Sequence, residues 1–266
     1  MPQILIASCP PVGHIGPLLN VARGLVQRGD RVTVLTSARH SSAIRAAGAT
    51  PMPLPAAADY DDSTLDADFP GRAQTSGIAR INHDVKHIFV RPLPYQAAAV
   101  ADALAADTFD AVLADAFFLG TLPLLLNPAP NRPPILAYST TPLFLTSRDT
   151  APGGTGIAPS ATRLGRLRNK ALKVLAQRAL LRPSQQSLNN MLDVLGLPEL
   201  PAFVLDAGIV ADRLIVPTIP EFEYPRSDLP AHVRFVGAVA PAPAPSTAAT
   251  APDAEAAGAD VDGEKK

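Results

Sequence analysis

The chain has 266 residues, of which 47% are hydrophobic and 18% charged, and its formal net charge is -1. This is enough for one large domain with a full core or for two small ones. The near-neutral charge argues against a nucleic-acid-binding protein. The single cysteine, Cys9, excludes an internal disulfide framework and favours a reducing, cytoplasmic compartment. The first residues lack the basic region of a secretory signal, and no apolar run approaches the ~20 residues that span a bilayer.

The first 36 residues predict a parallel strand–helix–strand unit. The continuous apolar run at 4–6 is typical of a strand that is covered on both faces. After a loop, apolar residues recur at helical spacing over 18–26, and Gly29 is suited to end that helix. Pro17 can take the first helical position, where its missing N–H costs nothing. A second strand follows at 31–36.

The alternation of strands and helices continues along the chain. We expect strands at 3–8, 31–36, 50–54, 111–114, 135–138, 212–216 and 233–236. Further helices are expected at 38–47, 78–89, 95–106, 117–126, 161–181 and 185–195. Irregular loops are expected at 55–72 and 140–160, and long loops of this kind are more often functional than idle. The fold class is therefore α/β, with a doubly wound, Rossmann-like parallel sheet.

The expected helix at 161–181 has a basic face. Its cations are Arg163, Arg166, Arg168, Lys170, Lys173 and Arg178, and its apolar stripe consists of Leu164, Leu167, Ala171 and Leu175. A basic amphipathic helix can lie on an anionic membrane surface. The simpler interpretation, which we favour, is a surface helix that packs through its apolar stripe and exposes its charges to solvent.

The composition changes abruptly at residue 240. The segment 240–266 is rich in alanine, proline, serine and threonine, with scattered acidic residues and almost no large apolar side chain. Such a segment cannot bury a core, so we expect a disordered linker or tail at 240–266 and a folded domain at 1–239.

Two nucleotide-binding motifs are absent from the sequence. A nicotinamide-dependent dehydrogenase needs Gly-x-Gly-x-x-Gly after the first strand and an acidic residue near the end of the second. The first loop has only Gly13 and Gly16, and the second strand ends in Leu-Thr-Ser at 35–37. The Gly-Lys-Ser/Thr of a P-loop is also missing. Both classes of enzyme are therefore disfavoured.

Two polar residues are expected at one edge of the sheet. His14 follows the first strand and Asp115 ends the fourth, and ligands of open α/β sheets bind at the carboxyl ends of the strands. Asp110 precedes the fourth strand and so belongs to the opposite edge. His83 and His87 share a helix face at a spacing that can bind metal, but no third ligand is apparent and we expect no metal site there.

Four segments, in order along the chain, carry a resemblance to a known family. Gly-His-Ile-Gly-Pro-Leu-Leu at 13–19 resembles the N-terminal half of family 1 glycosyltransferases of the GT-B fold, and bacterial macrolide-type UDP-glycosyltransferases are the most similar in appearance. The segments at 109–115, 147–159 and 234–237 resemble the strand of the second catalytic residue, the acceptor-side loop and the strand before the interdomain linker. The first motif is weak alone, but the ordered set is strong evidence.

The resemblance implies an inverting hexosyltransferase, which moves a hexose from a UDP-sugar to a hydroxyl of a small, apolar acceptor. His14 matches the family's general base, and Asp115 matches the carboxylate that orients it. Gly13, Ile15 and Gly16 would face the departing diphosphate from the helix N-terminus. The family pattern implies a UDP-sugar as co-substrate, no other cofactor and no metal.

Five apolar side chains are candidates for the lining of the acceptor pocket. They are Phe89, Phe117, Phe118, Leu143 and Phe144. Ligand pockets are typically lined by such aromatic and apolar groups. Ordinary core packing is the alternative for each of them, and a small buried filler is the expected role of Cys9.

The resemblance covers the part of the family that binds the acceptor. Family members have a second Rossmann-like domain whose signature segment contains a tryptophan, and this sequence has no tryptophan. We therefore expect the donor-binding domain to be absent from these 266 residues and the isolated chain to be inactive. Three interpretations stay open: a fragment, a half-enzyme whose donor domain is a separate subunit, or a non-catalytic acceptor-binding module.

Overall fold

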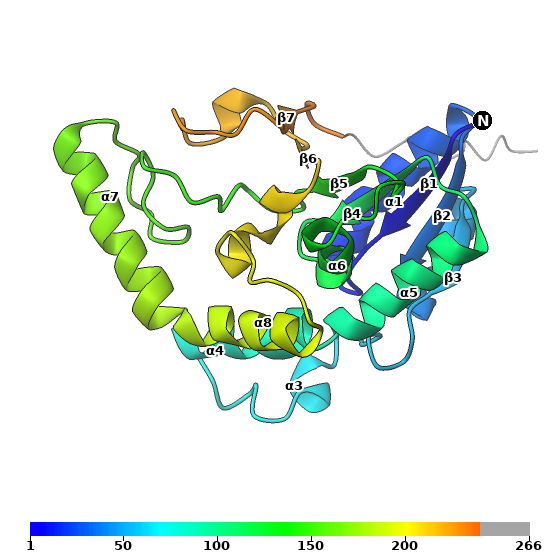
Figure 1. The fold of residues 1–266 in the computed structure, drawn as a ribbon, viewed down its shortest axis with the longest axis horizontal. Coiled ribbons are helices and arrows are strands. Elements are labelled where there is room, and N and C mark those ends of the chain that lie inside the picture. Colours follow the sequence, from blue (N-terminus) through cyan, green and yellow to red (C-terminus); the bar gives the residue numbers. More distant parts are fainter. Residues whose placement is uncertain (240–266) are drawn as a thin grey trace, which may run out of the picture.

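The computed structural model describes residues 1–239, which form one parallel sheet with helices on both faces (Figure 1). The strands are β1 Gln3–Ala7, β2 Arg31–Thr36, β3 Thr50–Pro53, β4 Ala111–Asp115, β5 Ile135–Tyr138, β6 Arg213–Val216 and β7 Val233–Phe235. Their order is β3-β2-β1-β4-β5-β6-β7, and every neighbouring pair is parallel. The predicted doubly wound α/β fold is confirmed. The expected linker or tail at 240–266 lies outside the described residues.

Helices connect the strands and cover both faces of the sheet. The α-helices are α1 Val12–Gln27, α2 Ser41–Ala46, α3 Leu65–Asp68, α4 Gly77–Asp84, α5 Leu93–Ala106, α6 Leu122–Leu126, α7 Arg163–Leu175 and α8 Arg182–Val194. Short 3₁₀ helices are η1 Ala38–His40, η3 Leu119–Thr121, η5 Val204–Val210 and η6 Pro220–Phe222, and π-helical segments are η2 Val85–Val90 and η4 Ala176–Leu180. Within residues 1–239, no helix combines the length and apolar character needed to cross a bilayer.

Burial on both faces explains the continuous apolar run of β1. Leu5 and Ala7 pack into a cluster that includes Val100 of α5. Ile6, which points to the other face, packs with Leu18 of α1. All of these side chains have no exposed surface, as expected for a strand in the interior of a parallel sheet.

The start of α1 differs from the prediction. The helix begins at Val12 rather than at Pro17, so Pro17 lies inside it and cannot donate to the carbonyl of Gly13 four residues earlier. Pro11 is the extended N-cap residue, and the N–H of Val12 donates to the Asp62 carboxylate at 2.9 Å. A partner from a distant loop satisfies this first-turn donor, and sequence spacing alone does not reveal such a partner. His14 therefore belongs to the first turn of α1.

The orientation of α7 also differs from the prediction. The α7 stripe, defined as Leu164, Leu167, Ala171 and Leu175, faces solvent. Leu164 is 80% exposed and Leu167 is 63% exposed, whereas Asn169 on the protein-facing side is fully buried. The buried side of α7 is small and polar: Gly165 packs closely on Ser160, and the amide of Asn169 donates to the Arg148 carbonyl at 3.2 Å. The expectation that the stripe packs on the protein is therefore wrong.

The contrast between these two environments gives a stability prediction. Leu5→Ala should lower the free energy of unfolding by about 2–5 kcal/mol, because it leaves a cavity in the core. Leu164→Ala should change it by less than about 0.5 kcal/mol, because the side chain is already in solvent. Urea unfolding of the two variants measures both effects, and similar losses for the two would contradict the burial described here.

Candidate active site

His14 and Asp115 form a hydrogen-bonded pair at the carboxyl edge of the sheet. The His14 Nδ1 lies 2.7 Å from the Asp115 Oδ2, which confirms that the two side chains meet. The Asp115 carboxylate is fully buried, while 16% of the His14 side chain is exposed. Asp110 is at the other edge, where its carboxylate accepts a hydrogen bond from the backbone N–H of Gln3 at 2.7 Å.

The sheet topology brings the pair together. β1 and β4 are adjacent and parallel, with Ala7 opposite Ala114, although about a hundred residues separate them in the chain. The chain leaves β1 toward α1 and leaves β4 at Asp115, so both functional groups lie at the same end of neighbouring strands. The strand order reverses between β1 and β4, and this reversal marks the crevice where doubly wound folds bind ligands.

The contact with Asp115 sets the proton distribution of His14. A carboxylate that accepts from Nδ1 fixes the Nδ1–H tautomer and leaves the lone pair on Nε2. Nε2 makes no hydrogen bond within residues 1–239. Burial acts to lower the pKa of His14, but the charge and hydrogen bond of Asp115, together with the charge of Asp62, raise it above 6.5. The site thus provides a free imidazole nitrogen with increased basicity.

Thr140 is a member of this site that the sequence analysis missed. Its Oγ1 donates to the Asp115 Oδ1 at 3.3 Å and also lies 3.3 Å from the His14 Nδ1. The backbone N–H of Phe117 donates to the same carboxylate oxygen at 3.2 Å. Thr140 comes just after the carboxyl end of β5, so the rule that identified His14 and Asp115 would have identified it too.

Two of the predicted acceptor-lining residues contact the imidazole. The rings of Phe89 and Phe117 lie 5.7 Å and 5.8 Å from that of His14, measured between centroids, and 5.3 Å from each other. The sequence analysis named both residues, but only the fold shows that they flank the base.

The other predicted apolar residues have different environments. Phe118 is 2% exposed and packs in the core, so the expectation that it lines an open pocket is wrong. Leu143 and Phe144 border a cavity of about 20 Å³ together with Phe117, and this is too small for an acceptor. Phe144 is 41% exposed, and its ring lies directly over Gly153 of the long loop.

The three residues predicted to face the diphosphate differ in their exposure. Gly13 is exposed in the first turn of α1, with open space beside it, and Gly16 is partly buried. The Ile15 side chain is 1% exposed and packs in the core, so only its backbone can face a ligand.

A polar cluster, built by Arg39 of η1 and two acidic residues of the loop after β3, holds this first turn. Arg39 forms ion pairs with Asp61 and Asp62, and its Nη2 donates to the Pro10 carbonyl at 3.1 Å. Burial acts to raise the pKa of Asp62, but hydrogen bonds from Arg39 and Val12 keep it below its ordinary value. The sequence analysis predicted only an irregular loop here. It did not predict that the acidic residues of this loop would pair with Arg39.

Tyr60 in the same loop is half-buried, and its hydroxyl is buried near this polar cluster. Its hydroxyl has no hydrogen-bond partner within the described residues. Burial, reinforced by the negative charges of Asp115 and Asp62, raises the pKa of the phenol. Tyr60 is thus a neutral hydroxyl near the histidine–aspartate pair.

A third metal-binding side chain lies next to the pair. Donor atoms of Cys9, His14 and Asp115 lie within 4.8 Å of one another. A metal ion binds the thiolate form of cysteine, but burial and the charge of Asp115 raise the pKa of Cys9 well above its usual value. Cys9 has no exposed surface and packs in the core, as the sequence analysis expected of a small filler.

His83 and His87 do not belong to any cluster of three such donors within residues 1–239. Their rings stack at 4.5 Å between centroids. The neighbouring Asp84 forms an ion pair with Arg72 at 2.8 Å.

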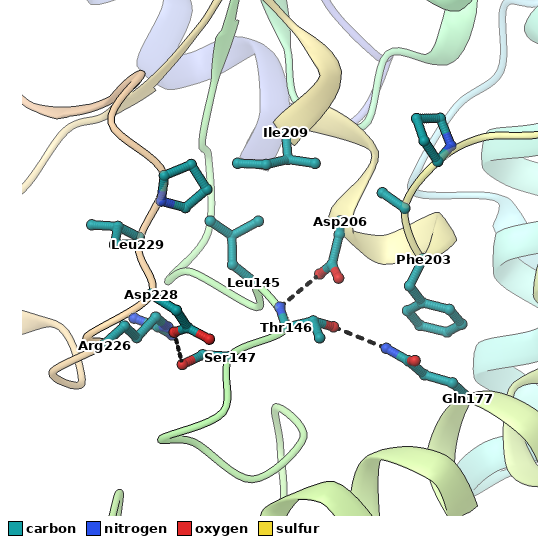
Figure 2. A pocket seen from close by; sticks show the side chains of 13 residues that line it. Leu145, Thr146, Ser147, Gln177, Phe203, Asp206, Ile209, Arg226, Asp228 and Leu229 are labelled. Atoms are coloured by element: carbon teal, nitrogen blue, oxygen red, sulfur yellow. Dashed lines mark hydrogen bonds between the residues drawn. The ribbon is translucent and has the colours of Figure 1, made fainter. Parts of the chain in front are cut away.

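A separate cavity of about 260 Å³ lies between the loop after β5, the 3₁₀ helix η5 and residues 226–230 (Figure 2). In it, the Thr146 N–H donates to the Asp206 carboxylate at 3.2 Å, and the Gln177 amide donates to the Thr146 hydroxyl at 2.9 Å. None of its lining residues is a predicted site residue. The pair therefore lies outside this cavity.

The raised pKa of His14 can be tested directly. Asp115→Asn should lower the pKa of His14. The substitution removes the negative charge that stabilises the imidazolium, while burial continues to disfavour it. An NMR pH titration of the His14 ring signal, assigned by its loss in His14→Ala, measures the shift. Asp110→Asn at the opposite edge of the sheet is the matched control and should leave the titration unchanged. Equal His14 pKa values with Asp and Asn at position 115 would contradict the proposed electrostatics.

The same shift predicts how stability depends on pH. A histidine with a raised folded-state pKa contributes stability that is full below its unfolded pKa, near 6.5, and is lost as the pH rises through the folded-state value. The difference in unfolding free energy between the unaltered protein and His14→Ala should therefore shrink over that range. Urea unfolding at a series of pH values measures it, and a difference that grew with pH would have the wrong sign.

Comparison with known proteins supports the resemblance found in the sequence. No family model matches the chain. The chain is 33% identical over 243 residues to 4'-demethylrebeccamycin synthase of Lentzea aerocolonigenes. The matched region covers 90% of this chain and 57% of that protein. It is 32% identical over 252 residues to UDP-glycosyltransferase 2 of Phaeomoniella chlamydospora, with 90% and 54% covered. The chain thus spans a little over half the length of these relatives.

Solved structures show the same fold. The glycotransferase of kitacinnamycin matches with a TM-score of 0.59 at 23% identity, over 90% of this chain and 52% of that one. The calicheamicin glycosyltransferase CalG4 matches with a TM-score of 0.55 at 18% identity, over 90% and 53%. The described residues therefore have the fold of one half of a GT-B glycosyltransferase. In sequence, the chain is a homologue of UDP-glycosyltransferases over a little more than half of their length.

Proposed function

We propose that this chain is the acceptor-binding half of an inverting UDP-sugar glycosyltransferase that transfers a hexose to a hydroxyl of a small, apolar acceptor. The observation that carries the proposal is the His14–Asp115 pair, placed where β1 and β4 end, with the His14 Nε2 free of protein partners within residues 1–239. The homology to UDP-glycosyltransferases supports the reaction class. A cytoplasmic location is part of the same proposal and is supported by the single buried Cys9.

In the proposed mechanism, His14 is the general base. The acceptor hydroxyl donates a hydrogen bond to Nε2. As its oxygen forms a bond to the anomeric carbon, the proton moves to Nε2 and the bond from that carbon to UDP breaks on the opposite face. Asp115 stabilises the imidazolium that forms and holds its ring in place. Thr140 and the Phe117 N–H keep the carboxylate oriented through their hydrogen bonds. His14 then releases its proton to solvent.

On the donor side, the exposed backbone at Gly13 and the positive end of the α1 dipole would face the diphosphate. Neither a metal ion nor a further cofactor is part of the proposal. The rest of a GT-B enzyme would bind the UDP-sugar, either as a continuation of the same protein or as a separate subunit, so we expect these 266 residues alone to bind acceptor without turnover. Phe89 and Phe117 beside the base, with Phe144 farther along, would contact the apolar acceptor.

A fusion to a donor-binding half tests this function. The chain is joined to the part of the Lentzea aerocolonigenes relative that it does not match, and UDP release from UDP-glucose is measured with a panel of hydroxylated aromatic compounds. We expect acceptor-dependent turnover that His14→Ala lowers by about 10²–10⁴-fold, because the attacking hydroxyl loses its base. The rate should rise with pH up to the raised pKa of His14, because only the neutral imidazole accepts a proton.

Two controls separate a catalytic loss from a structural one. His232→Ala and Asp110→Asn remove a histidine and a carboxylate that hydrogen-bond elsewhere in the fold, and they should keep most of the turnover. Acceptor binding to the 266-residue chain, measured by calorimetry, should survive His14→Ala. Binding without turnover in every fusion would replace the proposed function with that of a non-catalytic acceptor-binding module.

A further inference from the structure

Helix α7 presents an apolar face that nothing covers within the described part of the chain. Leu164, Leu167 and Leu175 of the α7 stripe are 80%, 63% and 51% exposed, and Val174 beside them is 45% exposed. The helix stands at the end of the molecule far from β1, β2 and β3 (Figure 1). Thirteen helical residues give the face a length of about 20 Å. An exposed row of large apolar side chains indicates a surface that contacts something else.

The charge around this face has one sign. Residues 150–192 contain no aspartate or glutamate, and their basic residues are Arg163, Arg166, Arg168, Lys170, Lys173, Arg178 and Arg182. These seven positive charges contrast with a net charge of -1 for the whole chain, so the remainder is acidic. Within residues 1–239, Arg166 is the only one of the seven that forms an ion pair, with Asp149 at 2.8 Å.

The cations border the apolar face and extend into a groove beside it. At helical spacing, Arg163 and Lys170 lie on one flank of the α7 stripe and Arg168 lies on the other. A groove of about 610 Å³ runs along the first flank, and its cations come from Arg148, Arg166, Lys170, Lys173 and Arg178. Leu167 and Val174 form its apolar lining. The groove can therefore contact the anionic groups and the apolar chains of one ligand side by side.

This charge distribution favours a lipid surface over a second copy of the chain. Two copies of the chain that met stripe to stripe would bring their unpaired cations together, and like charges in an interface cost several kcal/mol. An anionic lipid surface instead supplies phosphates to the flanks while the leucines enter the boundary between headgroups and acyl chains. Juxtamembrane cations gain from the negative surface potential of such a leaflet.

We propose that α7 lies in the plane of an anionic membrane surface, with the α7 stripe and Val174 inserted and Arg163, Arg168 and Lys170 paired with lipid phosphates. The groove beside this face shares no lining residue with the His14–Asp115 pair. Lipid binding does not require sugar transfer, so the proposal stands or falls independently of the proposed function.

Vesicle sedimentation of the full 266-residue chain tests this surface. We expect binding to phosphatidylcholine vesicles that contain about 30 mol % phosphatidylglycerol, and little binding to phosphatidylcholine alone. Arg163→Gln combined with Lys170→Gln should weaken binding to the anionic vesicles by roughly 10- to 30-fold. Leu164→Ser combined with Leu167→Ser should abolish the binding that persists at high salt, because salt screens the charges but not the apolar insertion.

Matched substitutions elsewhere complete the test. Arg45→Gln combined with Arg91→Gln removes two exposed cations elsewhere, one from α2 and one from the turn after η2, and Val194→Ser removes a side chain that is 81% exposed on α8. Both controls should bind anionic vesicles like the unaltered chain. Equal binding to neutral and anionic vesicles, or equal losses in the controls, would overturn the proposal. So would an absence of vesicle binding together with a dimer, seen by light scattering, that Leu164→Ser and Leu167→Ser dissociate.

Discussion

The contact between His14 and Asp115 depends on the adjacency of two strands that are distant in the chain. β1 and β4 lie side by side and parallel because the connection between them places β2, β3 and several helices to one side before returning. Both strands then end at the same edge, and their last residues hold the two functional groups. A buried carboxylate against an imidazole is stable only where further donors satisfy it, and Thr140 and the Phe117 N–H supply them.

The loop after β3 supports the same site from the other side. Asp62 accepts the first free N–H of α1, and Arg39 ties that loop to the Pro10 carbonyl. These contacts hold the turn that contains His14, and the charge of Asp62 adds to the factors that raise its pKa. The polar atoms near the base thus come from four separate stretches of chain that meet at the edge of the sheet.

Helix α7 shows a limit of reasoning from periodicity. The spacing of its leucines correctly indicates an amphipathic helix, but it does not say which face meets the protein. The small Gly165 and the hydrogen-bonded Asn169 provide the protein-facing side, so the leucines remain in solvent. The orientation of α7 follows from two contacts: the close packing of Gly165 and the hydrogen bond of the buried Asn169 amide. Both contacts depend on neighbours outside the helix.

The sequence alone determined the fold class, the positions of the seven strands within residues 1–239 to within one residue, the residues of the central pair and the resemblance to UDP-glycosyltransferases. These features depend on local patterns: apolar runs long enough for two-sided burial, glycine and proline at helix ends, and polar residues at strand ends. Only the tertiary structure decided that α1 begins at Val12, that Phe118 and the Ile15 side chain are buried, that Thr140 joins the pair and that the α7 stripe is exposed. Each of these depends on contacts between residues far apart in the chain, which no local pattern encodes.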